Sequence, residues 1–139
     1  MSDLDRILKK LNDFRVDTER AVDDTVLITA NRVKNTALKD IRNPSVGRKY
    51  PRGKEGKYHI ASKPGYAPNN DTNVLSESIK VSHARGTMTA KIGTNKDYGA
   101  ILEIEMNRPW LEPAVGPHVA NYHTQLEKVI DEQIRKADR

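Results

Sequence analysis

The sequence contains no cysteine, which excludes a disulfide framework and any metal site built on thiolates. No apolar run approaches the roughly 18 residues of a membrane-spanning helix, so no membrane partner is expected. The first residues lack the basic and apolar regions of a signal peptide, which predicts a soluble protein made and used without export by that route. Apolar residues are also scarce, at 36% of the chain with 5% aromatics, against roughly 45–50% in typical domains when glycine is counted. With 31% charged residues, this composition indicates either a largely solvated surface or a chain that a partner completes.

The positive charge of the chain is concentrated in one segment. At 139 residues the sequence predicts a single domain, residues 1–139, with a net charge of +5. Residues 42–63 carry seven basic side chains and one acidic side chain, whereas the remainder carries 17 basic and 18 acidic residues. The segment is therefore a local basic patch on an otherwise balanced protein. Its central basic residues, which we predict to contact a partner or another subunit, are Arg48, Lys49, Arg52, Lys54 and Lys57.

Residues 1–41 are predicted to be helical. Residues 2–41 contain neither glycine nor proline, and apolar residues recur at spacings of three and four. Ser2 can cap the helix, and Asn43–Pro44 ends it. An unbroken helix would be roughly 60 Å long, whereas a compact domain of this size has a radius of gyration of about 14 Å. The helix must therefore break near residues 16–18, giving two ordinary helices packed on one sheet, or project so that another chain covers its apolar stripe.

Residues 42–73 are predicted to be an extended basic loop. Four of the seven prolines and four of the eight glycines lie here, and no hydrophobic periodicity runs through the segment. Loops of this length in small domains are commonly functional or become ordered on binding. Tyr50, Tyr58 and Tyr66 are interleaved with the basic residues, a pattern that also occurs where proteins neutralise phosphates and stack bases. No phosphate-binding loop, RNA-binding aromatic pair or zinc-finger spacing accompanies it, so a solvated loop, or one that docks on an acidic protein surface, is the favoured interpretation.

The rest of the chain predicts a small sheet and a final helix. A helical turn at residues 74–75 leads into a hairpin over residues 79–93, and residues 98–105 fit either a helical turn or a strand. Trp110 follows, between two prolines. The segments together predict an α+β domain, in which a small antiparallel sheet packs against a long N-terminal helix and a C-terminal helix, with a long basic loop rich in proline and glycine. The predicted boundaries are 1–41 for the first helix, 42–73 for the loop, 74–112 for the hairpin and short elements, and 113–137 for the last helix.

No catalytic constellation is recognisable. Ser76–Ser78 lacks the glycine elbow of a serine hydrolase, and Glu103 and Glu105 would share one side of a strand, which a solvated face explains. We therefore expect no enzymatic activity, no cofactor and no metal site. The histidines are scattered, and none pairs at helical spacing with another type of ligand: His59, His83, His118 and His123.

Three stretches, in order along the chain, resemble one protein family. The first comprises residues 61–68 and Asp71–Ile79, the second is Tyr98–Glu103, and the third is Arg108–Ala114. The third, arginine–proline–aromatic–leucine–x–proline–alanine, is the most specific. With a long helix before them and a helix after them, they make most of the chain similar to the tail-completion proteins of tailed bacteriophages and prophages, also described as head–tail joining or minor tail component proteins.

The resemblance implies a structural protein of the phage neck, located in the virion, assembled in the host cytoplasm and without enzymatic activity. Relatives of this kind build a homo-oligomeric ring, sixfold or alternatively twelvefold. It lies between portal-side or head-closure proteins and the tail tube or tail terminator protein. The implied fold is a small sheet flanked by helices, and we expect Trp110 to be buried within its own subunit. The family motif would form a rigid corner before the last helix, made of Arg108, Pro109, Trp110, Leu111 and Pro113.

The basic loop has two interpretations under this resemblance and one outside it. It could reach an adjacent subunit or a neighbouring ring, or it could line the channel and contact passing DNA without sequence preference. The competing class of function is a small basic nucleic-acid-binding α+β protein that uses residues 42–63. In that case, replacing the basic residues of the loop should flatten the salt dependence of DNA binding.

Two positions depart from the family pattern. Asn73 stands where the family usually has glycine, and because asparagine also tolerates a left-handed backbone, the turn is expected to survive. Glu103 is followed by Ile104–Met106, where the family tends to have an aromatic residue and a glycine. The connection to Arg108 is therefore expected to differ in shape.

Overall fold

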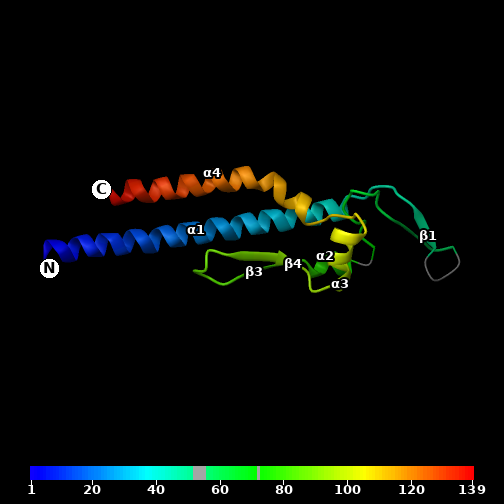
Figure 1. Cartoon of the computed structure of the whole chain (residues 1–139), viewed down its shortest axis with the longest axis horizontal. Helices are drawn as coiled ribbons and strands as arrows, with labels where there is room; N and C mark the ends of the chain where they lie inside the picture. The colour runs from blue at the N-terminus through cyan, green and yellow to red at the C-terminus, as the bar shows by residue number, and fades with distance from the viewer. Residues whose placement is uncertain (52–55, 72) are drawn as a thin grey trace.

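The computed structural model describes residues 1–51, 56–71 and 73–139. Two long helices lie side by side, a β-hairpin runs along the first of them, and the smaller elements gather at the end remote from both termini (Figure 1). The fold is α+β, with two small antiparallel sheets of two strands each among the described residues. The molecule is therefore elongated, with both termini at one end and the smaller elements at the other.

Helix α1 (Asp3–Arg42) is continuous over 40 residues. Ser2 begins it with a capping box: the Ser2 hydroxyl accepts from the Asp5 backbone N–H, and the Asp5 carboxylate accepts from the Ser2 backbone N–H. The Ser2 hydroxyl and then the Ser2 backbone N–H donate to the Asp5 carboxylate, and these two hydrogen bonds lower the pKa of Asp5 below its ordinary value. Asn43 ends the helix in an extended conformation that Pro44 requires. Of the two predicted alternatives, the projecting helix is the one observed, and the predicted break at residues 16–18 is absent.

Helix α4 (Glu112–Ala137) runs antiparallel to α1 and packs along it, as the adjacent chain ends in Figure 1 show. The Thr36 hydroxyl lies 2.6 Å from His118 Nε2 and links the two helices near the start of α4. The last turns of α4 lie beside Asp17–Asp24, because Gln133 and Lys136 share a shallow depression with this part of α1. The first turns of α1, which carry Leu4 to Leu11, therefore extend past the end of α4 (Figure 1).

The predicted hairpin is present as strands β3 (Lys80–His83) and β4 (Ala90–Gly93), with Val81 opposite Ile92. It packs against α1, whereas α4 lies on a different side of α1 (Figure 1). The predicted packing of the sheet against the first helix is confirmed, whereas α4 packs on the other side of α1, so the prediction that the last helix also covers the sheet is wrong. The buried apolar core lies at the end remote from the termini and consists of Val33, Ala37, Ile41, Leu75, Ile79, Trp110 and Ala114.

Three short helical elements build that end. Helix α2 (Val74–Ser78) starts from Asn73, whose φ of 64° is left-handed, as expected for the residue in the glycine position of the family. Helix α3 (Asp97–Ala100) continues directly into a π-helical turn, η1 (Ile101–Glu105). Residues 98–105 are therefore helical, and the alternative prediction of a strand is wrong. The π-helical turn closes with the Met106 N–H donating to the Ile101 carbonyl at 2.9 Å.

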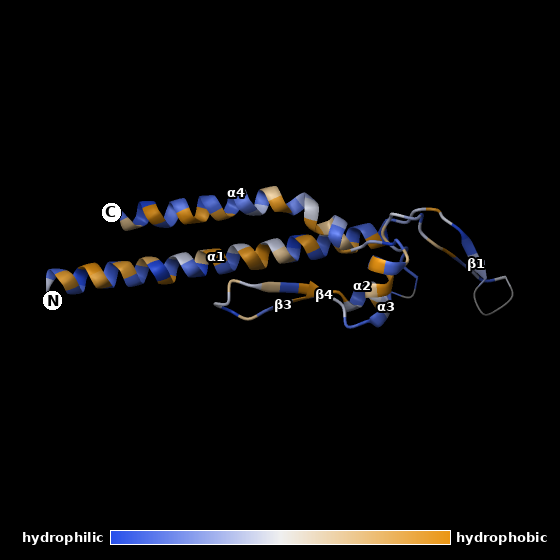
Figure 2. Ribbon diagram, in the orientation of Figure 1, coloured by the Kyte–Doolittle hydropathy of each residue, from blue (hydrophilic) through white to orange (hydrophobic). Residues whose placement is uncertain are grey.

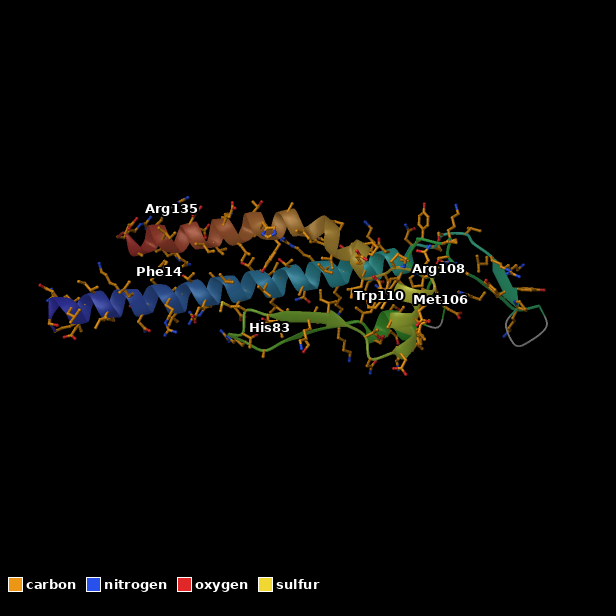
Figure 3. The ribbon with its side chains drawn as sticks, in the orientation of Figure 1. Phe14, His83, Met106, Arg108, Trp110 and Arg135 are labelled. Carbon is orange, nitrogen blue, oxygen red and sulfur yellow. The ribbon has the colours of Figure 1, made fainter. Side chains whose placement is uncertain are left out.

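One carboxylate fastens the hairpin to α1. Asp23 is buried on α1, and its Oδ1 accepts from His83 Nε2 at 2.8 Å and from the Met88 N–H at 2.8 Å. Its Oδ2 accepts from the Gly86 N–H at 3.0 Å. Figure 3 shows His83 on the hairpin side facing α1. Because these donors stabilise the ionised form, Gly86 and then His83 contributing most, the pKa of Asp23 falls from 3.8 to about 2.

Acidification is expected to weaken the attachment of the hairpin. A carboxylate whose pKa is lower in the folded than in the unfolded chain stabilises the fold above its unfolded pKa, and this contribution is lost as the pH falls. The window here extends from about pH 4 to about pH 2. Denaturant midpoints across that window should fall more steeply for the native chain than for Asp23→Asn, which is destabilised already at pH 6. Asp24→Asn, at the exposed neighbouring position, is the matched control; parallel pH profiles for the native chain and Asp23→Asn would contradict the assignment.

Candidate interaction site

The predicted basic loop contains a two-stranded ribbon. Strand β1 (Lys49–Pro51) pairs antiparallel with strand β2 (Tyr58–Ile60), with Tyr50 opposite His59. The ribbon projects from the body at the end opposite the termini (Figure 1). Strands of three residues are marginal on their own, so their pairing depends on the segment that anchors them. These strands were not expected from the sequence, because the surrounding prolines and glycines obscure the short alternation at residues 58–60.

The root of the ribbon is tied by backbone and amide hydrogen bonds. The Gly47 N–H donates to the Ala61 carbonyl at 2.8 Å, and a Cβ at Gly47 would lie 2.5 Å from the Ser62 carbonyl oxygen. Glycine is therefore required for the two segments to approach so closely. The Asn69 side chain donates to the carbonyls of Ser45 and Ile60 and accepts from the Ser45 N–H. One amide thus joins both sides of the root.

The predicted contact residues lie on this ribbon as far as the structure describes them. Arg48, Lys49 and Lys57 are exposed, and Arg52 and Lys54 lie outside the described residues. The Arg48 guanidinium carbon lies 5.2 Å from the centre of the Tyr50 ring, and Lys49 Nζ lies 4.2 Å from the centre of the Tyr58 ring. These cation–π contacts orient the charges along the ribbon. The described part of the ribbon thus carries exposed basic side chains beside exposed aromatic rings.

The predicted corner is a buried tryptophan held at two points. Trp110 is only 3% exposed, and its Nε1–H donates to the Gly99 carbonyl at 2.9 Å. Gly99 itself is buried, and a Cβ there would lie 2.5 Å from Thr94 Cγ2. The prediction that Trp110 is buried within its own chain is therefore confirmed. Leu111 packs at the edge of the same core.

The other motif residues surround this tryptophan. Pro109 is half-buried, and Pro113 lies in the first turn of α4, where a missing N–H has no consequence. The Arg108 guanidinium donates to the carbonyls of Met106 and Asn107 at 2.9 and 3.2 Å. Figure 3 shows Trp110, Met106 and Arg108 gathered at the end of the molecule that carries the ribbon. The corner thus connects η1 to α4 at the end of the molecule that carries the ribbon.

Glu103 caps α4 across the corner. Its Oε2 accepts from the backbone N–H groups of Trp110 and Leu111 at 2.5 and 3.0 Å, and its Oε1 accepts from the Glu112 N–H at 2.9 Å. A carboxylate at a helix N-terminus satisfies free donors and complements the helix dipole. The expectation that Glu103 lies on a solvated face is wrong, because η1 turns its side chain back toward α4. Only its position seven residues before Trp110 could have hinted at this role.

A mostly apolar cavity of about 660 Å³ separates the ribbon root from η1. Tyr50 and His59 line it from the ribbon, Leu102 and Met106 from η1, and Leu75 from α2. Its size is within the range of small-molecule sites. Of the described residues that line it, Arg108 is the one cationic side chain, and its guanidinium already donates to two backbone carbonyls. The lining also includes polar side chains, among them Asn70, Asp71 and Ser62, whose buried hydroxyl has no hydrogen-bond partner among the described residues.

A second unpartnered surface lies at the opposite end, on the part of α1 that extends past α4. Its apolar residues form a stripe on one side of the helix, visible as orange bands near the N-terminus in Figure 2. We call this stripe the α1 overhang; it comprises Leu4, Ile7, Leu8 and Leu11, which are 54–63% exposed. A helix with such a stripe ordinarily buries it against another element.

The histidines serve structural contacts. His83 and His118 hold the hairpin and α4 against α1, and His59 Nδ1 lies 3.6 Å from the Asp71 carboxylate. Across residues 1–51, 56–71 and 73–139, no three His, Asp or Glu side chains gather in a way that could hold a metal ion. Within the same part of the chain, none of the helices has the length and apolar character needed to cross a bilayer.

Comparisons of the chain with protein-family models, with characterised proteins and with solved structures find no match.

Proposed function

We propose that this chain is a non-enzymatic structural subunit of a bacteriophage neck, where copies form a ring that completes the tail and joins it to the head. The partners on the two sides of the ring would be portal-side or head-closure proteins and the tail tube or tail terminator protein. Assembly would take place in the host cytoplasm and the product would be located in the virion. The proposal rests on the three sequence stretches described above and on the surfaces of the fold.

The observation that carries the proposal is that the molecule exposes two unpartnered surfaces, one at each end, and has only a small buried core. The α1 overhang exposes an apolar stripe at one end, and the basic ribbon projects at the other. The buried core comprises seven residues, clustered near the ribbon end. Burial of apolar surface is the main favourable term in folding and in association, so a chain that leaves this much of it exposed gains stability from neighbours. A ring of identical subunits supplies such neighbours through heterologous contacts that close by rotation.

The ribbon also allows a second candidate function, binding of nucleic acid. Arg48, Lys49 and Lys57 are exposed, which would suit neutralisation of phosphates. However, Arg48 lies over the Tyr50 ring and Lys49 over the Tyr58 ring, so one face of each aromatic ring is already occupied. Stacking of bases on these tyrosines is therefore disfavoured. Binding to phosphates alone, without sequence preference, is compatible with a ring whose channel conducts DNA.

The test is the phenotype of particles assembled without this chain. We expect electron microscopy of lysates from a phage or prophage that lacks it to show separate filled heads and separate tails, restored to joined particles by expression of the chain in trans. Joined, normal particles in its absence would refute the joining role. A variant with Arg48, Lys49 and Lys57 replaced by glutamine separates the two candidates. If the main role is nucleic-acid binding, the isolated native protein should bind DNA with a steep salt dependence that this variant flattens.

A further inference from the structure

We propose that the outer face of η1 receives the basic ribbon of an adjacent copy of this chain. We call this face the η1 patch; it comprises Ile101, Ile104 and Glu105. The inference deepens the proposed function, since it rests on the ring and names the two surfaces that meet between its subunits. Three features of the described residues support it: exposure, charge and position.

The η1 patch is the most exposed apolar surface near the core. Ile104 is 80% exposed and Ile101 is 41% exposed. The π-helical turn causes this exposure, because its wider ring directs Glu103 inward to cap α4 and leaves Ile104 outside. π-Helical turns are rare and occur frequently at functional sites. A large aliphatic side chain held in water on a rigid turn is the feature expected of a contact residue.

The charges of the η1 patch and the ribbon are complementary. Glu105 belongs to the patch and Asp97 lies beside it, and neither forms an ion pair within the described part of the chain. The ribbon presents exposed Arg48, Lys49 and Lys57 beside the exposed Tyr58 and Ile60. Lys96 borders the same groove as Ile104, so the surroundings of the patch carry two acidic side chains and one basic one, whereas the described ribbon carries three basic ones. Such pairing favours the correct partner and penalises the contact of like surfaces.

The ribbon of the same chain does not cover the patch. Tyr50 and His59 face Tyr98, Leu102 and Met106 across the cavity described above, whereas Ile101, Ile104 and Glu105 do not line it. Ile104 instead borders a groove on another side of η1, between the end of β4 and Leu111 of the corner. The occupant of this outer side must therefore come from another molecule.

The position of the two surfaces favours a second copy placed side by side. Both lie at the same end of the elongated chain, remote from the termini (Figure 1). Copies arranged laterally, with their long helices roughly alongside one another, bring the ribbon of one to the η1 patch of the next. Because the two surfaces differ, the contact is heterologous and can close into a ring. The α1 overhang lies at the far end and would take no part in this contact.

The test uses native mass spectrometry on the full chain and on variants of each surface. Lys49→Glu/Lys57→Glu alters the ribbon, and Ile104→Glu/Glu105→Lys alters the patch; all four side chains are exposed, so folding, monitored by circular dichroism, should be unchanged. We expect the native chain to form a closed oligomer and each variant alone to fall to the 15.7 kDa monomer. An equimolar mixture of the two variants retains one intact ribbon and one intact patch, so it should give dimers of about twice the monomer mass. Ile28→Glu, an exposed apolar position in the middle of α1, is the matched control and should assemble normally.

Several results would overturn the inference. It fails if the patch variant assembles like the native chain, if the mixture gives no dimers, or if the native chain stays monomeric at high concentration. The proposed function is judged separately by the particles: separate heads and tails without the chain, together with normal assembly of the patch variant, would sustain the neck role and reject this contact. Joined particles without the chain, together with dimers in the mixture, would reject the neck role and support the contact between the ribbon and the η1 patch.

Discussion

Replacing Trp110 by alanine is expected to lower the free energy of unfolding by about 3–5 kcal/mol, the cost usual for deleting a large aromatic side chain from a core. Trp110 is 3% exposed and contacts a core that contains few other large residues. A small domain is stable by only about 5–15 kcal/mol, so the variant should be partly unfolded under mild conditions. Urea denaturation followed by circular dichroism measures the change through the transition midpoint.

Trp110→Phe separates packing from hydrogen bonding at the same position. Phenylalanine keeps most of the ring in the core but leaves the Gly99 carbonyl without its donor, so a loss of about 1–2 kcal/mol is expected. If alanine and phenylalanine reduce stability equally, the hydrogen bond carries the effect. If neither variant shifts the midpoint, the corner does not stabilise the fold.

Replacing Glu103 by alanine is expected to cost about 2 kcal/mol, since one carboxylate supplies all the acceptors for three consecutive N–H groups at the start of α4. The loss should be local as well as global. Hydrogen exchange of the Trp110, Leu111 and Glu112 amides should accelerate more than exchange in the middle of α1. Glu103→Gln retains an acceptor oxygen and should lose about half as much stability.

Glu105→Ala provides the matched control for Glu103→Ala. Glu105 lies two residues further along η1, is exposed and makes no contact with the α4 N-terminus. Its replacement should leave the denaturation midpoint within about 0.5 kcal/mol of the native value. Equal destabilisation by the two substitutions would show that general negative charge near α4, and not the observed hydrogen bonds, accounts for the effect.

Much of the fold could be predicted because its signals are local. Ser2 and Pro44 mark both ends of α1 through capping and the proline restriction, and both ends were found where predicted. The alternation at residues 79–93 gave the hairpin, and Asn73 has the left-handed backbone expected of it. The burial of Trp110 within its own chain was expected from the resemblance of Arg108–Ala114 to the family motif. Each of these properties depends on neighbours within a few residues.

The remaining features depend on contacts between distant segments. The ribbon at residues 49–60 pairs strands too short to show periodicity, and Asn69 stabilises its root from outside the strands. Leu102 and Ile104 alternate as in a strand, but the segment forms a π-helical turn, in which the Glu103 carboxylate accepts hydrogen bonds from the start of α4. Asp23 likewise accepts its hydrogen bonds from Gly86 and Met88 only because the hairpin turn packs beside α1. No local sequence pattern specifies these tertiary contacts. The ribbon, the Glu103 cap and the Asp23 attachment were therefore not predicted.

Because α1 is unbroken, it sets a fixed distance between the two ends of the molecule. A helix without kinks fixes the spacing between the α1 overhang and the ribbon root, at about 1.5 Å for each intervening residue. A layer of parallel copies would take its thickness from this helix and not from the loops. Inserting seven residues after Arg15 would move the overhang outward by about 10 Å and rotate it by about 20°. A neighbour matched to the native spacing would then lose its contact, although the core, the ribbon and the η1 patch would all be intact.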